Sequence, residues 1–288
     1  FRVNLSSVVF ASLSVVFTYL FLYHLYLKSF RVIVTKSSKI QNPHAAENAP
    51  EWVFYLSAAV TALCFAFSRR FWSQALIAKG ALYTLNMLIL TSGLYVIMKW
   101  EENVRNMNLL YLFAFICGLG FANHNIFAPL TILFFNYIVY VWFLEVKPDK
   151  ITPWNIFKFV FCQFMALGVF YVTINPDVIG AKIAASLILF GAALLFTAVL
   201  TYEKYKVFWR CMFMVSLGLL IYSYLPIRAS KDPPLNWGDP SGFYTFMNHV
   251  LRKQYGVGPK QPYTAVLLAK QLYSFFIEWK SQMTLILL

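Results

Sequence analysis

Residues 5–27 read LSSVVFASLSVVFTYLFLYHLYL, a stretch that contains no Asp, Glu, Lys or Arg. A helix of about 20 apolar residues crosses the hydrocarbon core of a bilayer. Apolar residues make up 60% of the chain and charged residues 12%, whereas soluble domains average about 45–50% and about 25%. The apolar runs are continuous, unlike the alternating strands of a membrane barrel. The sequence therefore predicts an all-α polytopic membrane protein and excludes a soluble globular domain.

The distribution of apolar runs and basic loops predicts how the chain crosses the membrane. Of the 15 basic residues in the loops between the runs, counted with the adjoining run ends, 12 follow the first, third, fifth and seventh runs, and the positive-inside rule places these loops in the cytoplasm. This arrangement accounts for the net charge of +13 without a nucleic-acid partner. The long polar loop after the last run then lies on the outer face. The predicted spans, about eight in all, are Leu5–Leu27, Trp52–Phe67, Ala75–Met98, Asn108–Phe121, Ile126–Phe143, Trp154–Val172, Ile183–Leu200 and Val207–Leu225.

Polar residues of the outer face form two groups, and the first lies at the fourth and fifth spans. Residues 118–125, GLGFANHN, join these spans with almost no loop. Asn123, His124 and Asn125 either satisfy the helix ends of a tight hairpin or face a ligand. Lys79, near the outer end of the third span, either extends to the interface or presents a cation to a phosphate. The spacing leaves a structural role and a ligand-binding role open, both for the hairpin residues and for Lys79.

The second group follows the eighth span, in the proline-rich segment 224–240. Asp239 is followed by Pro240. This pair predicts that Asp239 is the N-cap of the next helix and that Pro240 is its first residue. That helix has apolar residues at i, i+3, i+4 and i+7, so we expect it to lie along the outer membrane surface. There an anionic headgroup would pair with Arg228, Arg252 or Lys253. Asp239 is alternatively an acid or base, since few other acids are placed on this face.

Four segments together carry a resemblance to a known family. They are residues 1–5 (FRVNL); residues 71–75 (FWSQA) with 83–86 (YTLN); residues 118–125; and residues 225–228 (LPIR) with 236–239 (NWGD) and 249–256 (HVLRKQYG). In this order they resemble a large, mainly bacterial family of polytopic membrane proteins related to the eukaryotic transmembrane protein O-mannosyltransferase of the endoplasmic reticulum. That family is similar to the GT-C superfamily of membrane glycosyltransferases, so the resemblance implies a GT-C-like fold.

The resemblance also implies an activity and a place in the cell. It implies transfer of a sugar from a polyprenyl-phosphate donor to a protein or glycan acceptor on the outer face. The membrane would be the bacterial inner membrane, or that of the endoplasmic reticulum in a eukaryote. The partners are the lipid bilayer, the lipid-linked sugar and other membrane subunits, with no nucleic acid. The sequence assigns no bound cofactor and no metal ligands, and a divalent metal is compatible with the implied chemistry.

The implied roles fall on the outer-face groups. They are cavity lining for Asn123, His124 and Asn125; contact with the donor phosphate for Lys79, Arg228 and Arg252; and a lid for Trp237 and Asp239, with Asp239 as the candidate catalytic acid or base. The expected organisation is a transmembrane bundle at 1–225, an outer loop with an amphipathic surface helix at 226–262, and a surface segment with the start of a further span at 263–288.

The sequence departs from the family pattern at two positions. Because of these departures, we do not expect the 288 residues by themselves to form a complete catalyst. The family carries a Gly-Asp-x-Gly-Glu loop just upstream of its Arg-Val-Asn segment, and Phe1 begins after that position. Lys79 stands where many relatives have Glu. We therefore expect the chain to be a piece of a longer polypeptide that supplies the acid. The alternatives are a non-catalytic structural subunit of a larger membrane complex and, third, a transporter, although Asp and Glu are absent from the middle of the spans.

Overall fold

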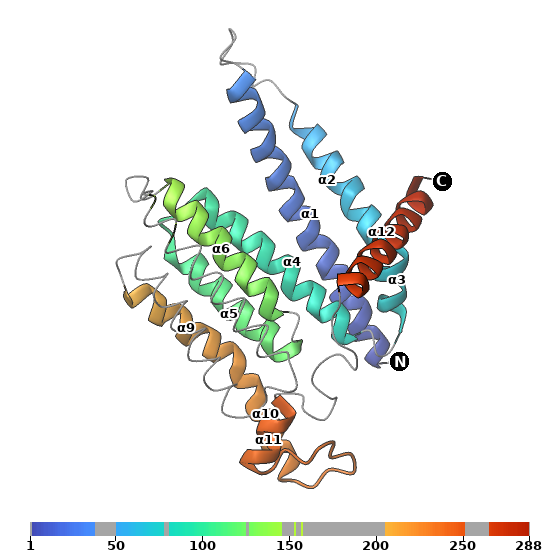
Figure 1. Ribbon diagram of the computed structural model, residues 1–288, viewed down its shortest axis with the longest axis vertical. Helices are drawn as coiled ribbons and strands as arrows, with labels where there is room; N and C mark the ends of the chain where they lie inside the picture. Colours follow the sequence, from blue (N-terminus) through green and yellow to red (C-terminus); the bar gives the residue numbers. More distant parts are fainter. Residues whose placement is uncertain are drawn as a thin grey trace. The chain divides into compact units, whose positions relative to one another are not determined.

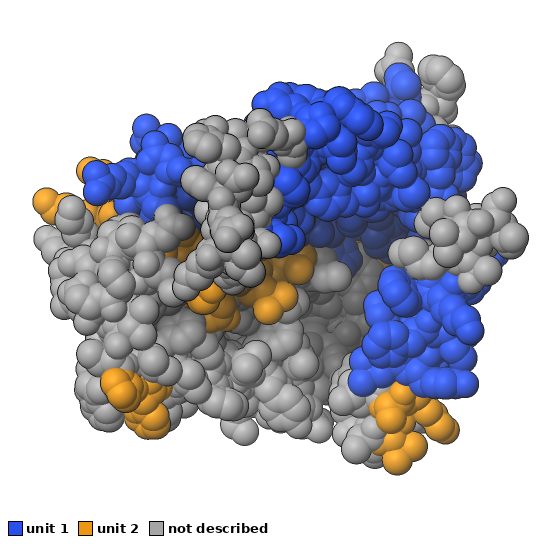
Figure 2. All heavy atoms as spheres, turned by 90° about the horizontal axis from the view of Figure 1, so that it is seen from above, with its two compact units in different colours: residues 1–127, 272–288 blue, residues 128–271 orange. Residues whose placement is uncertain are grey.

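The computed structural model describes residues 2–37, 50–77, 81–124, 127–145, 153, 157, 205–250 and 265–287. Every element within these ranges is an α-helix or a 3-10 helix, which confirms the all-α class (Figure 1). The chain divides into two compact units, the first made of residues 1–127 and 272–288 and the second of residues 128–271 (Figure 2).

Helices α1 (Arg2–Ser37) and α4 (Ala81–Glu102) pack side by side and form the centre of unit 1 (Figure 1). Their contact is lined by small residues, among which Ser7, Ser14 and Thr84 are fully buried. The hydroxyl oxygens of Ser7 and Thr84 lie 3.4 Å apart. Ser14 Oγ also lies 3.4 Å from the Thr84 carbonyl oxygen and donates to it. Small residues of this kind let membrane helices approach closely.

The two central helices run in the same direction. Their first turns meet at Ser7 and Thr84, and their far ends meet where Lys28 forms an ion pair with Glu101. The chain therefore leaves α1 and α4 at the same end of unit 1. This confirms the sequence prediction that the first and third spans share a direction.

A broken helix connects these two. Helix α2 (Glu51–Ala66) and helix α3 (Arg69–Leu76) are bent by 62° relative to each other. At the break, Ser68 has an extended backbone and is the N-cap residue of α3. Its carbonyl oxygen accepts a hydrogen bond from the Trp72 N–H at 2.9 Å. The chain thus turns sharply without a long loop.

Apolar contacts hold α3 in this direction. Phe71 and Ala75 are buried on one face of α3 and pack against Ala11 of α1. The rings of Phe65 and Phe71, on either side of the break, have centroids 4.3 Å apart. The close packing of these side chains favours the bent conformation over a straight helix.

Helices α5 and α6 follow α4 and form a tight hairpin. Helix α5 (Met107–Asn123) begins beside Asn106, whose side-chain oxygen accepts the Asn108 N–H at 3.2 Å as an N-cap. Helix α6 (Phe127–Glu145) begins four residues after α5 ends. A Cβ atom on Gly120 would lie 2.3 Å from the buried ring of Phe127, so glycine is required for this approach.

The described part of unit 2 contains residues 128–145 of α6, residues 265–271 of α12 (Ala265–Leu287) and, between them, one long helical run and a turn region. Helix α9 (Tyr205–Leu219), the 3-10 helix η5 (Leu220–Ser223) and helix α10 (Tyr224–Ala229) follow one another without interruption. Turns then lead to the short helix α11 (Phe243–Val250), and α12 ends the described chain. A helix is therefore present where one was predicted after residue 239, and its position along the membrane surface stays a prediction.

Three helical segments within the described ranges are long and apolar enough to cross a membrane, and the α2–α3 pair makes a fourth if it counts as one broken span. The three are Leu5–Ile33, Ala81–Glu102 and Trp209–Ala229, at the first, third and eighth predicted spans. The predicted start of the third span at Ala75 is wrong, because Ala75 lies in α3 and a new helix begins at residue 81. The sixth and seventh predicted spans lie outside the described residues.

Candidate functional site

The hairpin residues Asn123 and His124 lie against the first turns of α4. Asn123 Nδ2 donates to the Leu82 carbonyl oxygen at 3.1 Å and to Asn86 Oδ1 at 3.5 Å. The imidazole of His124 and the ring of Tyr83 have centroids 6.2 Å apart. Two of the predicted site residues therefore lie together, and both face the start of α4.

The local backbone explains this placement. Helix α5 ends at Asn123, and His124 adopts an extended conformation with φ −154° and ψ 138°. The His124 N–H donates to the Gly120 carbonyl oxygen at 2.9 Å, and the Phe127 N–H donates to the His124 carbonyl oxygen at 3.1 Å. Backbone groups close the helix end, so the Asn123 amide is directed to α4 instead of capping its own helix.

Buried hydroxyl groups extend the site toward α1. Ser7 Oγ donates to the Gln74 carbonyl oxygen at 3.0 Å and also contacts the Thr84 hydroxyl. This links the first turns of α1 and α4 with the end of α3. Five polar side chains thus lie at the same end of α1, α4 and α5, with Ser7 and Thr84 paired between α1 and α4 and with Asn86 and Asn123 paired between α4 and α5. We call them the polar end cluster: Ser7, Thr84, Asn86, Asn123 and His124.

The chemistry of the polar end cluster suits a neutral or anionic polar ligand. The amides of Asn86 and Asn123 offer both donors and acceptors, and the imidazole of His124 offers a donor, an acceptor or a positive charge. Ser7 and Thr84 are fully buried, so they position the helices and do not reach a ligand. None of the five is an acid. Sequence reasoning did not select Ser7, Thr84 or Asn86 as site residues. Ser7 and Ser14, spaced i and i+7 and therefore on one face of the helix, were the signal that could have indicated a polar seam.

Three of the predicted site residues, Lys79, Asn125 and Arg252, lie outside the described residues. The remaining three belong to unit 2, so they are described by themselves. Arg228 is exposed near the end of α10. Trp237 is 71% exposed, in the turn that precedes Asp239.

Asp239 occupies a constrained turn and does not cap a helix. Its φ is 37°, in the left-handed region that Asp adopts more readily than most residues. Its Oδ1 accepts a hydrogen bond from Asn236 Nδ2 at 2.9 Å. The predicted N-cap role is wrong, because α11 begins only at Phe243. The first helical bond runs from the Phe246 N–H to the Gly242 carbonyl oxygen, so Gly242 is the cap residue.

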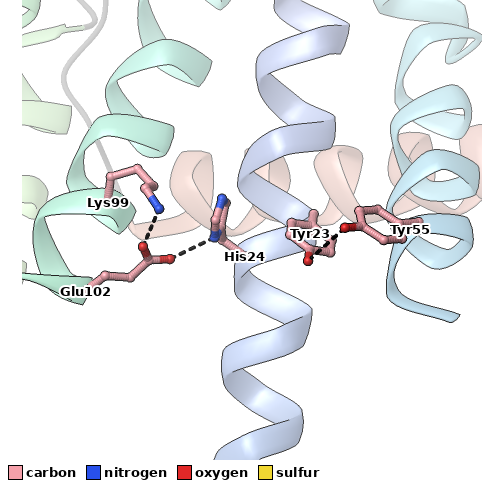
Figure 3. A network of polar contacts seen from close by, with 5 residues as sticks. All are labelled: Tyr23, His24, Tyr55, Lys99 and Glu102. Carbon is pink, nitrogen blue, oxygen red and sulfur yellow. Dashed lines mark hydrogen bonds and ion pairs between the residues drawn. The ribbon is translucent and has the colours of Figure 1, made fainter. Parts of the chain in front are cut away.

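A second polar network lies at the opposite end of α1 and α4. His24 Nδ1 lies 2.7 Å from Glu102 Oε1, and Lys99 pairs with the other oxygen of the same carboxylate (Figure 3). On the other side of α1, the hydroxyl groups of Tyr23 and Tyr55 are 3.3 Å apart and their rings stack (Figure 3). These contacts tie α1 to both α2 and α4 at the end predicted to be cytoplasmic.

An ion pair joins α3 to α12. Arg70 donates to the carboxylate of Glu278, and this hydrogen bond holds the pKa of Glu278 below its ordinary value. The charge of Arg69 acts in the same direction. Glu278 shares a polar stripe of α12 with Gln271 and Ser274, at helical spacings of four and three. Sequence reasoning placed both arginines and Glu278 on the outer face but did not pair them.

Comparison with known proteins identifies the family of the first half of the chain. Residues 1–150 match the family model described as the protein O-mannosyl-transferase TMEM260 N-terminal domain. The chain belongs to this family. The match covers α1 to α6 and so contains the whole polar end cluster, whereas Arg228, Trp237 and Asp239 lie beyond it. No curated protein and no solved structure matches the chain.

Membership of the TMEM260 N-terminal domain family confirms the relation to O-mannosyltransferases that the sequence segments indicated. It indicates a glycosyltransferase-like function for a chain whose apolar helices are those of a membrane protein. Within the described ranges, no group of three or more His, Cys, Asp or Glu side chains could hold a metal ion.

Proposed function

We propose that the chain is part of a GT-C-like membrane glycosyltransferase. It moves a sugar, a mannose or another hexose, from a polyprenyl-phosphate donor to a protein or glycan acceptor on the outer face. The observation that carries the proposal is the polar end cluster, which lies inside the region matched by the O-mannosyltransferase family. A polar cluster at the end of apolar helices is where a lipid-linked sugar would present its headgroup.

The proposed roles follow from the chemistry of each group. The amides of Asn86 and Asn123 bind sugar hydroxyls or phosphate oxygens, since each amide both donates and accepts hydrogen bonds. His124 donates to the departing phosphate, which gains negative charge as the glycosidic bond breaks. The buried contact between Ser7 and Thr84 keeps the starts of α1 and α4 in register, so that the amides keep their positions.

Residues of unit 2 have proposed roles at the same step. Arg228 is exposed and carries a permanent positive charge, which suits bidentate binding of a phosphate. Asp239 is the proposed acid or base, and its carboxylate does not serve as a helix cap. Trp237 provides an exposed aromatic face of the kind that stacks on sugar rings. Lys79, Asn125 and Arg252 keep their proposed contacts with donor phosphate or sugar.

A transferase assay tests this function. The full-length protein in proteoliposomes would receive a polyprenyl-phosphate-linked radioactive mannose and an acceptor peptide. We expect His124→Ala and Arg228→Ala each to lower the rate of sugar transfer. Asn103→Ala is the matched control, because Asn103 is exposed just beyond the opposite end of α4 and should leave transfer unchanged. Undiminished transfer by both test variants would remove these residues from the site, and transfer of no sugar by the wild type would refute the function.

A further inference from the structure

Helix α3 has the surface of a helix that lies at a membrane interface. Successive residues on a helix are about 100° apart, so its exposed side divides into two edges. Trp72 and Leu76 form an apolar edge and are 48% and 57% exposed. Arg70 and Ser73 form a polar edge, and Arg69 lies between the two. The remaining side is the buried face that packs against α1.

The residues around the bend extend the apolar edge. Phe67 is 64% exposed, and its ring stacks on that of Trp72 with centroids 5.3 Å apart and an interplanar angle of 29°. Helix α3 is bent by 62° from α2. With α2 crossing the membrane, the axis of α3 is therefore inclined toward the plane of the bilayer. Exposed aromatic pairs at such a position are typical of the headgroup level.

The charge of this surface is positive. Arg69 and Arg70 both act on Glu278, and only Arg70 donates a hydrogen bond to it. Two guanidinium charges therefore act on one carboxylate, and the pair of Arg70 with Glu278 leaves the charge of Arg69 in excess. Arg69 is exposed beside the apolar edge, which is the depth at which lipid phosphates lie.

We propose that α3 docks on an anionic bilayer surface. Phe67, Trp72 and Leu76 insert into the boundary between headgroups and acyl chains, and Arg69 binds the headgroup phosphate of an anionic phospholipid. Arg70 stays paired with Glu278, which fixes α12 beside the same surface. This proposal does not depend on the transferase activity, because it concerns the bulk lipid around unit 1 and not a donor at the polar end cluster.

The experiment uses a local fluorescent reporter. The full chain, with its native cysteines replaced, would carry a bimane on Ser73→Cys or Leu76→Cys in phosphatidylcholine nanodiscs. The quencher is a trace of nitroxide-labelled phosphatidylglycerol or phosphatidylcholine. We expect the anionic lipid to be enriched about fivefold near Ser73 at low salt, because a surface arginine contributes about 1 kcal/mol toward anionic lipid. Added salt should reduce this excess.

Substitutions decide the assignment of the phosphate partner. Arg69→Gln should abolish the excess quenching by phosphatidylglycerol, and Arg69→Lys should keep most of it. Arg105→Gln is the matched control, since Arg105 is an exposed arginine beyond the far end of α4; it should leave quenching at Ser73 unchanged. Equal quenching by both lipids in the parent chain would overturn the proposal, as would an excess that survives Arg69→Gln. A reporter at Leu76 that is no deeper than one at Ser73 would refute the interfacial docking of α3.

Discussion

Lys28 and Glu101 form an ion pair although they belong to helices separated in sequence by the whole of α2 and α3. The Glu101 side chain is 9% exposed and that of Lys28 is 43% exposed. The carboxylate is therefore the more costly group to leave without its partner. Because the pair lies far from the contact of Ser7 with Thr84, these two contacts fix α1 and α4 in register at both ends.

We predict that Lys28→Met destabilises the protein more than Lys99→Met. Removal of Lys28 takes away one hydrogen bond to the Glu101 carboxylate, which is 9% exposed, and the loss of a hydrogen bond to a charged group costs about 1.5–3 kcal/mol. Lys99 pairs with Glu102, whose side chain is 42% exposed and also contacts His24, so its removal should cost about 0–1 kcal/mol. Thermal unfolding in detergent micelles measures both values. Equal losses would contradict the difference in burial.

We predict that Gly120→Ala destabilises the α5–α6 hairpin. The new Cβ atom would lie 2.3 Å from the ring of Phe127, which is 1% exposed and has no room to move aside. Overpacking of this kind costs about 1–3 kcal/mol. Gly93→Ala is the control, because its Cβ atom would meet Phe113 at 3.4 Å, close to ordinary contact. Thermal midpoints should fall for Gly120→Ala and stay nearly constant for Gly93→Ala; a fall in both would point to helix flexibility and not to Phe127.

We predict that Asn86 and Asn123 act as a coupled pair in sugar transfer. Asn86→Ala and Asn123→Ala should each lower the rate about tenfold, the equivalent of one hydrogen bond of about 1.4 kcal/mol. The double variant should lose less than the product of the two single losses, because either substitution already breaks the 3.5 Å contact. Rates from the proteoliposome assay give this coupling directly. Strictly multiplicative losses would show that the two amides bind separate groups.

We predict that the contact of Arg70 with Glu278 contributes to stability only above acidic pH. Glu278 has a lowered pKa in the folded protein, so its contribution is present above the ordinary carboxyl pKa and is lost as the pH falls through the lowered value. Glu278→Gln should therefore lower the thermal midpoint slightly at neutral pH and not at strongly acidic pH. Both groups are exposed, so the difference is small.

The control for this pH dependence is Asp232→Asn. Asp232 is also an exposed carboxylate, and Asn tolerates its left-handed φ of 45°. For this variant, the change in thermal midpoint relative to the parent chain should be the same at neutral and at strongly acidic pH. If it behaves as Glu278→Gln does, the effect comes from net charge and not from the pair with Arg70.

We predict that Ser73 and Arg105 lie on opposite faces of the membrane. Ser73 lies in α3, next to the start of α4, and Arg105 follows the end of α4, which is long enough to cross the membrane. In right-side-out vesicles, an impermeant maleimide should label Ser73→Cys and reach Arg105→Cys only after permeabilisation. Labelling of both before permeabilisation would refute the assignment from the basic loops.

Hydropathy and charge predicted the parts of the fold that depend on the bilayer. They predicted the helical class, the positions of α1, α2, α5 and α6, and the shared direction of α1 and α4. They did not predict the bend at Ser68, because residues 75–82 are apolar enough apart from Lys79 to read as the start of the third span, and residues 68–74 then read as a loop. The fold there depends on the burial of Phe71 against α1, a tertiary contact that no local pattern contains.

The sequence predicted those site residues that are polar at a depth where polar residues are rare. It did not predict the site residues that are polar at positions where polar residues are common. Asn123 and His124 stood out because polar residues at membrane depth are rare. Asn86 and Ser7 did not stand out, since single polar residues near helix ends are common. Their importance follows from meeting Asn123 and Thr84 in space. The cap role of Asp239 was wrong for a related reason: Gly242 and Thr245 start α11 with their own hydrogen bonds, three residues further along the chain.

The parallel contact between α1 and α4 has a consequence for biogenesis. Ser7 meets Thr84, which is 77 positions later in the chain, so a ribosome that adds about 5–20 residues per second needs roughly 4–15 s to synthesise its partner. During this interval the hydroxyl groups of Ser7 and Ser14 lie in the membrane without α4. The Ser14 hydroxyl is nevertheless satisfied, since it donates to the Phe10 carbonyl of its own helix at 2.7 Å. A newly inserted α1 therefore already satisfies part of its polar seam, and its docking partner arrives only after the bent α2–α3 segment has been inserted.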